Sequence, residues 1–180
     1  MLQITTNSVE LWDEQREKFV CIEGQTLQLE HSLVSLQKWE SKWRKPFLSK
    51  TEKSREEILD YIRCMTITPN VNPEVYLGLS KDNVDKIQEY IAAPMTATTF
   101  SEDKTAKNDR EIVTAEIIRY WMISFNIPYV YETWHLNSLL TLIRVCNVKN
   151  APQKKHSKGE IMSRNAALNK ARRQRLNSRG

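Results

Sequence analysis

The pattern of apolar and polar residues predicts short strands at the start of the chain and helices after them. The segments "MLQIT", "VELW" and "KFVCI" alternate in part and are separated by polar residues, which is compatible with small strands or a hairpin. After Gly24 and Thr26, the segment "TLQLEHSLVSLQKWESKW" has apolar residues at helical spacing, and Pro46 ends or deflects this helix. We therefore expect a small N-terminal β element followed by helical structure.

The next segments carry helix start and stop signals. Ser54 and Glu57 have the spacing of a capping box at the start of "SREEILDYIRCM". The segment "TPNVNPEVYLGL" is typical of a loop, with one short helical turn after Pro73. It leads into a predicted helix, "SKDNVDKIQEYIAA", which Pro94 stops.

A helical hairpin is predicted as the centre of the core. Residues 96–109 are small and polar, which indicates an exposed, mobile loop dividing the body into two halves. After it, Asn108 and Glu111 can cap "REIVTAEIIRYWMISF", which is apolar on so many sides that we expect burial on most of them. Thr133 is the predicted cap of "WHLNSLLTLIRVCNV". The expected core residues of this 111–148 hairpin include Trp121, Leu136, Leu139, Leu140, Ile143 and Cys146.

The end of the chain differs from the rest in charge. Residues 154–180 hold nine Lys or Arg and one acid, a balance of +8, so residues 1–153 carry 5 − 8 = −3. Ser157 and Glu160 have capping-box spacing, yet the apolar face of the helix they would start is thin, so this tail is expected to be helical or disordered until bound. The predicted partner-binding residues are Lys154, Lys155, Lys158, Arg164, Lys170, Arg172, Arg173, Arg175 and Arg179.

Composition supports one mainly α domain with an appendage. The body, residues 1–153, is long enough for one core, and the tail, residues 154–180, is added to it. The three cysteines lie far apart and have no Cys-x-x-Cys spacing, so we interpret them as buried thiols in a reducing compartment. No stretch approaches the ~18 uninterrupted apolar residues of a membrane span.

No pattern in the chain predicts catalysis, a cofactor or a metal site. His135 lies at a predicted helix start without a nucleophile at motif spacing, so it is interpreted as a structural residue that packs or caps. The pairs Glu56/Glu57 and Asp82/Asp85 are interpreted as surface charge at helix ends. Phosphate-binding glycine loops and hydrolase motifs are missing from the sequence, and we expect no enzymatic activity.

Two tryptophans leave an alternative open. Trp39 and Trp43 share a helical face beside several lysines and arginines, a mixture that can stack nucleic-acid bases. The other interpretation, which we favour, places both rings in the core with the lysines at its rim.

The basic tail has two candidate partners. Lys and Arg clusters bind phosphates with release of counterions, which favours nucleic acid. However, no known nucleic-acid-reading motif is found in the sequence. The second hypothesis is that the tail docks on an acidic protein surface and becomes ordered there.

Several phrases resemble the tail assembly chaperones of tailed bacteriophages. They are "QTLQLEHSLVSLQKWESKWRKPF", "EEILDYIRCMTIT", "EIIRYWMISFNIPYVYETWHLNSLLTLIRVCN" and "RNAALNKARRQRLNSRG", and they span most of the chain. The resemblance implies a mostly helical protein, without an active site, that works in the host cytoplasm during phage assembly. It would keep the tape measure protein soluble and bring tail tube subunits to it, binding through an apolar groove and the C-terminal arm. Alternatives are a basic nucleic-acid-binding phage protein and a virion component of the neck or tail.

Overall fold

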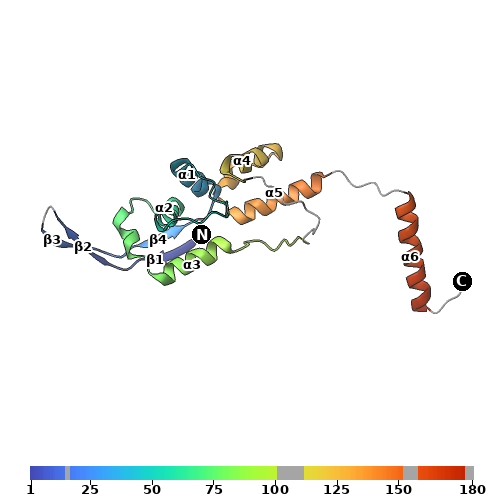
Figure 1. Cartoon of the computed structure of the whole chain (residues 1–180), viewed down its shortest axis with the longest axis horizontal. Helices are drawn as coiled ribbons and strands as arrows, with labels where there is room; N and C mark the ends of the chain where they lie inside the picture. Colours follow the sequence, from blue (N-terminus) through green and yellow to red (C-terminus); the bar gives the residue numbers. More distant parts are fainter. Residues whose placement is uncertain (15–16, 101–111, 152–157, 177–180) are drawn as a thin grey trace. The chain divides into compact units, whose positions relative to one another are not determined.

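A computed structural model describes residues 1–14, 17–100, 112–151 and 158–176. Within these ranges the chain is mainly α with small β elements at the N-terminus, as the sequence predicts (Figure 1). The elements in chain order are β1 (Leu2–Thr5), β2 (Val9–Asp13), β3 (Lys18–Ile22), β4 (Thr26–Leu29), α1 (Leu33–Trp43), α2 (Arg55–Met65), the 3-10 helix η1 (Pro73–Gly78), α3 (Lys81–Ala92), α4 (Ala115–Ser124), the 3-10 helix η2 (Tyr129–Thr133), α5 (Leu136–Asn150) and α6 (Lys158–Leu176).

The chain forms two compact units, Met1–Cys146 and Asn147–Gly180. The first unit contains the strands and every helix up to most of α5, and the second contains the end of α5 and α6. No helix in the described ranges is both long and apolar enough to cross a membrane.

The strands form two antiparallel pairs, and in the sequence the second pair lies between the two strands of the first. β1 pairs with β4, and the hairpin β2–β3 lies between them in sequence. The predicted strands at the start of the chain are confirmed, but the helix expected from Thr26 begins only at Leu33, after the N-cap Ser32. Leu27 and Leu29 are fully buried while Thr26 and Gln28 are exposed, which is the period of two that pairing with β1 requires. The leucine spacing fits both a helix and a strand, and the pairing partner decides between them.

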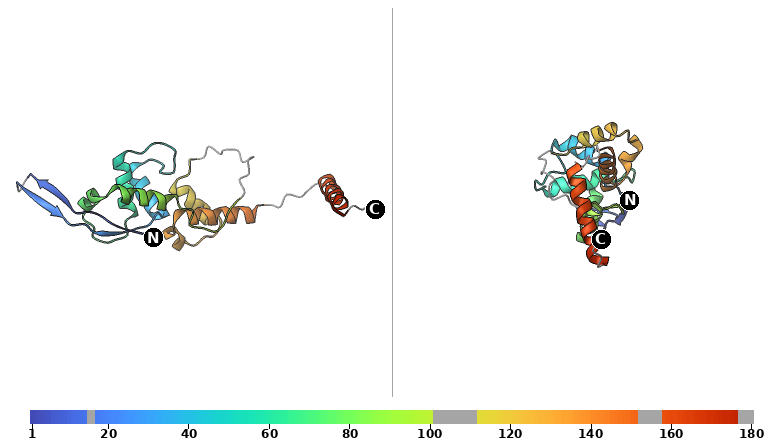
Figure 2. Two further views of the ribbon diagram at one scale, coloured as in Figure 1. Left: turned by 90° about the horizontal axis from the view of Figure 1, so that it is seen from below. Right: turned by 90° about the vertical axis from the view of Figure 1, so that its right-hand side faces the viewer.

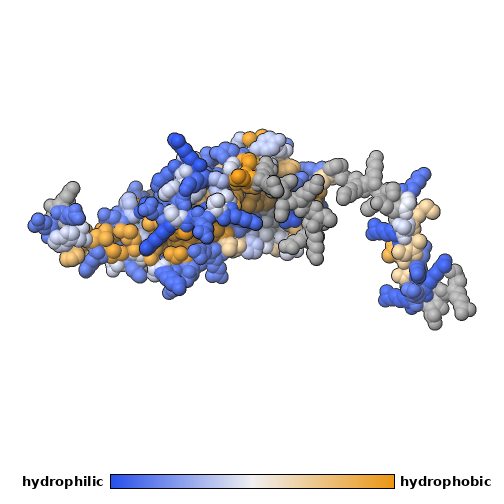
Figure 3. Space-filling view, in the orientation of Figure 1, coloured by the Kyte–Doolittle hydropathy of each residue, from blue (hydrophilic) through white to orange (hydrophobic). Residues whose placement is uncertain are grey.

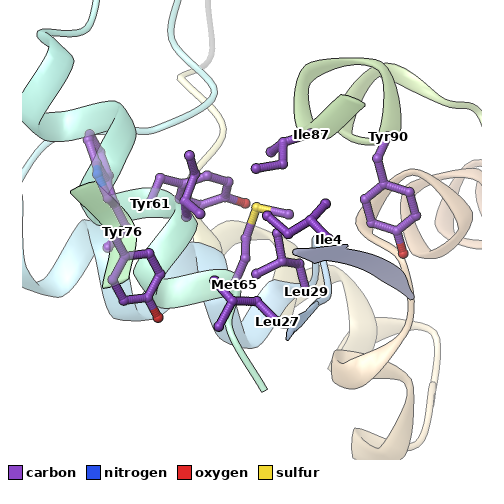
Figure 4. Packing of buried hydrophobic residues seen from close by; sticks show 10 residues of the cluster. Ile4, Leu27, Leu29, Tyr61, Met65, Tyr76, Ile87 and Tyr90 are labelled. Atoms are coloured by element: carbon purple, nitrogen blue, oxygen red, sulfur yellow. The ribbon is translucent and has the colours of Figure 1, made fainter. Parts of the chain in front are cut away.

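Helix α1 contributes to both hydrophobic clusters of the first unit. Its Trp39 packs with β1, β4, α2, η1 and α3 in the cluster whose members Figure 4 shows. Its Leu33 and Leu36 pack with α4 and α5 in the second cluster. Because α1 belongs to both clusters, the body is not divided into halves at the predicted loop. Of that loop, residues 96–100 have neither helix nor strand, and residues 101–109 lie outside the described residues.

The expectation that α4 is the central, mostly buried helix is wrong. Only its Ala115, Ile118 and Met122 are buried, whereas Tyr120 is 66% exposed and Ile123 is 59% exposed. The apolar residues of α4 extend around the helix, but α1 and α5 cover one side only. Trp121 and Leu140 are partly buried at the edge of this cluster rather than at its centre.

Local helix signals hold in α2 and α3, whereas the predicted cap of α5 is wrong. The Ser54–Glu57 capping box, the short helix after Pro73 and the end of α3 before Pro94 are all confirmed. Helix α4 begins at Ala115, and the proposed cap pair Asn108 and Glu111 lies outside the described residues.

The start of α5 differs from the prediction. Thr133 is the last residue of η2 instead of a helix cap. The backbone carbonyl of His135 accepts from the N–H of Leu139, so His135 takes the capping position. The cysteines also differ from the expectation of buried thiols, because Cys21 is exposed and both Cys64 and Cys146 are half-buried.

Candidate functional site

The predicted basic residues of the tail fall into two groups. Lys154, Lys155 and Arg179 lie outside the described residues. The other six lie on α6 and are exposed, namely Lys158, Arg164, Lys170, Arg172, Arg173 and Arg175. With Glu160 as its one acid, α6 carries 6 − 1 = +5. Ser157, the predicted cap, lies outside the description, directly before the first helical residue.

The cations surround α6 instead of forming one stripe. An α-helix turns by about 100° per residue, so Lys170, Arg172 and Arg173 follow one another at about 200° and about 100° around the axis. Four cations stand between positions 170 and 175, close to the C-terminal end, where positive charge is favourable to the helix dipole. Within the described ranges, none of the six cations has an ion pair. Figure 3 shows hydrophilic residues over the same end of the helix.

The apolar residues of α6 do not form a packed face. Ile161 and Leu168 are about half exposed, and Met162 and Leu176 are more than 70% exposed. This agrees with the thin apolar face predicted from the sequence. Since α6 belongs to a compact unit separate from the body, its helix offers charge rather than apolar area to a partner.

The favoured interpretation of both tryptophans as core residues is right for Trp39, whereas Trp43 is only partly buried against the first cluster. Trp39 is 1% exposed and its indole N–H donates to the Glu57 carbonyl at 2.8 Å, while the Trp43 indole donates to Asp60 at 2.8 Å. Lys42 forms an ion pair with Asp60, and Lys45 forms one with Glu57. Two of the neighbouring lysines are therefore already paired with acids of the fold, which disfavours this face as a base-stacking surface.

The interpretation of Glu56 and Glu57 as surface charge is only half right. Glu56 is exposed, but Glu57 is 4% exposed, because its side chain turns back to the Ser54 N–H and also receives the Lys45 ammonium. The hydrogen bonds from Lys45 and from the Ser54 backbone lower the pKa of Glu57. Asp82 and Asp85 are both exposed, as expected.

His135 has the structural role that the sequence predicts. Its Nε2 lies 3.0 Å from the Tyr90 carbonyl oxygen, which can only accept, so Nε2 carries the proton. Its Nδ1 then accepts from the Asn137 N–H at 3.3 Å, at the first turn of α5. Burial lowers the pKa of His135. Both ring nitrogens are thus engaged within the fold.

His31 stands next to this ring and is also buried. Its Nδ1 shares a hydrogen bond of 2.6 Å with the Tyr61 hydroxyl. Burial, reinforced by the nearby His135, lowers the pKa of His31 to about 4. A neutral imidazole here packs against the rings of Tyr61 and His135. The described residues contain no group of three or more His, Cys, Asp or Glu placed to hold a metal ion.

An apolar groove lies along α2, η1 and α3. Its main hollow has a volume of ≈ 600 Å³, and its rim carries Arg55, Glu56 and Gln88. A second hollow of ≈ 130 Å³ shares residues with the first and reaches Phe47. The apolar lining residues of the main hollow are Ile58, Leu59, Ile62, Tyr76, Leu77, Leu79 and Val84. Sequence patterns place Ile58 and Ile62 on one face of a helix but do not reveal that this face stays partly uncovered.

No known protein family matches the chain, and neither does any curated protein or solved structure.

Proposed function

We propose that this protein is a non-enzymatic binding factor for phage tail assembly, in keeping with its resemblance to the tail assembly chaperones. Its partners are the tape measure and tail tube proteins, which it meets in the host cytoplasm. The observation that carries the proposal is α6, whose six described cations are exposed and have no ion pair within the described ranges. An acidic partner surface would compensate part of this charge.

The groove of the body supports the same proposal. A hollow of ≈ 600 Å³ with apolar walls and a polar rim suits the apolar side chains of a partner helix. Ile58 is 39% exposed and lines both hollows, so part of this surface has no cover within the described chain. The body and α6 then contact one partner through different chemistry, apolar in the groove and ionic on the helix.

Co-expression with the tape measure and tail tube proteins tests this proposal. Deletion of residues 154–180 should leave the body folded and weaken capture of the tail protein, because the charge of α6 is lost. Ile58→Asp should also weaken capture, because it places a charge in the groove. The matched control is Ile67→Asp, since Ile67 is 54% exposed and does not line the groove. Equal capture of the tail proteins by all four proteins would contradict the proposal.

Nucleic acid is the second candidate partner, and the distribution of the cations around α6 favours it. A helix inside a nucleic-acid groove has phosphates on more than one side, and basic residues on all sides can then each approach one. An acidic protein patch, by contrast, would contact only part of the ring of cations.

Salt dependence separates the two candidates. If all nine basic residues of the tail met phosphates, the logarithm of the affinity for random DNA would fall with a slope of about −8 against the logarithm of the salt concentration. Lys170→Ala with Arg173→Ala should reduce this slope by about 2, and Gln174→Ala, on the same turns, should leave it unchanged. Tight DNA binding that disappears on deletion of the tail, with no tail protein captured, would favour the second candidate over the first.

A further inference from the structure

The hairpin β2–β3 carries apolar pairs on both of its faces. The register pairs Val9 with Ile22, Leu11 with Val20 and Trp12 with Phe19. Residues directly opposite each other share a face, so the first two pairs lie on one face and the aromatic pair lies on the other. The Trp12 and Phe19 rings are 5.0 Å apart and are 53% and 69% exposed. Figure 3 shows apolar residues along the hairpin behind a polar tip.

The base of the hairpin is fixed to the rest of the first unit. The Asn7 N–H donates to the Gly78 carbonyl at 2.9 Å, next to the start of β2. A Cβ on Gly78 would lie 2.1 Å from the Asn7 oxygen, and one on Gly24 would lie 2.2 Å from the Thr6 oxygen. The backbones therefore meet at distances that only glycine allows. Beyond this base the two strands extend away from the helices of the unit (Figure 2).

The two edges of the hairpin differ in how well they are protected. In the described chain no further strand pairs with β2 or β3. β2 carries the acids Glu10 and Asp13, whereas β3 has four consecutive residues, Phe19 to Ile22, without charge or proline. A free edge of this kind is a template for another strand, and an isolated two-stranded hairpin is marginal in water. The edge of β3 is thus the one suited to pairing.

We propose that β3 pairs antiparallel with β3 of a second copy of this chain, about a two-fold axis at Cys21. The pairing forms a four-stranded sheet with β2 at both edges, and the face that holds Val20 and Ile22 becomes continuous across the two copies. An antiparallel arrangement of identical strands has its axis at one residue, which faces itself. The occupant is a second copy because the edge matches itself: Val20 and Ile22 of one copy lie opposite Ile22 and Val20 of the other, and no like charges face each other.

Charge argues against an axis at Val20, the central residue of β3. An axis at Val20 places Glu17 opposite Glu23 of the second copy, and like charges directly opposite each other are unfavourable. An axis at Cys21 places Glu17 opposite Gln25 and Glu23 opposite Phe19, so no like charges meet. This register also puts the two exposed Cys21 residues face to face. Opposite residues of an antiparallel pair have Cα atoms about 4.5 to 5.5 Å apart, which is within disulfide reach.

Sedimentation velocity and thiol cross-linking of the full chain test the proposal. We expect a dimer at micromolar concentration. Cys21→Lys should convert it to a monomer, because two ammonium groups would face each other, while Cys21→Thr should keep the dimer. Copper phenanthroline with oxygen, which takes two protons and two electrons from a thiol pair, should give a covalent dimer. Cys21→Ser should abolish this product, and Cys64→Ser should retain it.

Three results would overturn the proposal. One is a monomer at every concentration tested. The others are a dimer that Cys21→Lys leaves intact and a dimer that gives no Cys21 cross-link. Circular dichroism of each variant shows whether the helices of the first unit are retained, so that unfolding is not mistaken for loss of the dimer.

Discussion

The Glu40 carboxylate near the end of α1 caps a helix that begins 75 residues later in the chain. Its Oε2 accepts from the N–H of Ala115, the first residue of α4, at 2.8 Å. Its Oε1 accepts from the N–H of Phe47, also at 2.8 Å. Thr114, at the N-cap of α4, makes no side-chain capping bond, so Glu40 supplies what the local sequence does not. A negative charge at this helix start is also favoured by the helix dipole.

Removal of this carboxylate should destabilise the first unit. Glu40→Ala leaves two backbone N–H groups without their acceptor in a site where Glu40 is only 8% exposed. We expect a loss of about 2 to 4 kcal/mol in the free energy of unfolding, and about half of that for Glu40→Gln, which keeps one acceptor oxygen. Urea denaturation measures both changes. Glu89→Ala, at an exposed position, is the control, and a loss for Glu40→Ala no larger than that of the control would contradict the capping role.

Alanine substitutions at two neighbouring leucines of α5 should differ sharply in their cost to the free energy of unfolding. Leu139 is 0% exposed in the second cluster, whereas Leu140 is only partly buried against it. Leu139→Ala should cost about 2 to 5 kcal/mol, because it leaves a cavity, and Leu140→Ala should cost clearly less. Thermal unfolding of the two variants makes the comparison. Equal losses of stability for the two variants would contradict the placement of Leu139 inside the second cluster and of Leu140 at its edge.

Gly78→Ala should destabilise the protein by more than about 1 kcal/mol. The added Cβ would lie 2.1 Å from the backbone oxygen of Asn7, and neither backbone can move without breaking the bond between them. Gly159→Ala is the matched control, since Gly159 is exposed on α6 and alanine is the better helix former. Chemical denaturation should therefore show a lower stability of the first unit for Gly78→Ala and an unchanged stability of that unit for Gly159→Ala. A Gly78→Ala protein as stable as the original would mean that the base of the hairpin is loose.

The stability of the fold should fall as the solution becomes acidic. The pKa of His31 is lowered to about 4 in the folded chain, against about 6.5 when unfolded. Between these two pKa values the unfolded chain binds more protons than the folded chain, so the free energy of unfolding decreases as the pH falls from about 7 toward about 5. The complete titration of His31, down to below its folded pKa, would remove at most about 3 kcal/mol.

Denaturation at several pH values checks this dependence, and His31→Asn provides the comparison. The asparagine amide can replace the Nδ1 contact with Tyr61 but does not titrate. The free energy of unfolding of the His31→Asn variant should therefore change less steeply with pH than that of the original protein. Glu57 has a lowered pKa and adds a loss of the same sign, but only at more acidic pH, as its carboxylate becomes protonated. A flat stability profile from neutral pH to about pH 5 would contradict the role assigned to His31.

His135→Gln should preserve partner binding and lower stability modestly. The imidazole donates to the Tyr90 carbonyl and accepts from the Asn137 N–H, and glutamine can reproduce only part of this geometry. We expect a loss of about 1 kcal/mol. Affinity for the captured tail protein, measured beside the free energy of unfolding, separates the two effects. Loss of binding with unchanged stability would give His135 a functional role instead.

Much of the local structure is determined by the sequence alone. The capping box of Ser54 and Glu57, the helical turn after Pro73 and the stop at Pro94 depend on residues within a few positions of one another, and all are found in the structure. The exposed basic residues of α6 could also be predicted, because charge density needs no tertiary contact to be recognised. The presence of strands near the start followed from alternation over a few residues.

Only the tertiary structure decided which of several local options each segment takes. Residues 26–29 fit a helix and a strand equally well, and pairing with β1 selects the strand. The apolar sides of α4 are equivalent in sequence, and contact with α1 and α5 buries one of them. The same holds for Glu57, interpreted as surface charge until Lys45 is seen to pair with it, and for Glu40, which accepts from the N–H groups of Phe47 and Ala115. Burial and long-range hydrogen bonding depend on chain segments far apart, so no local pattern can encode them.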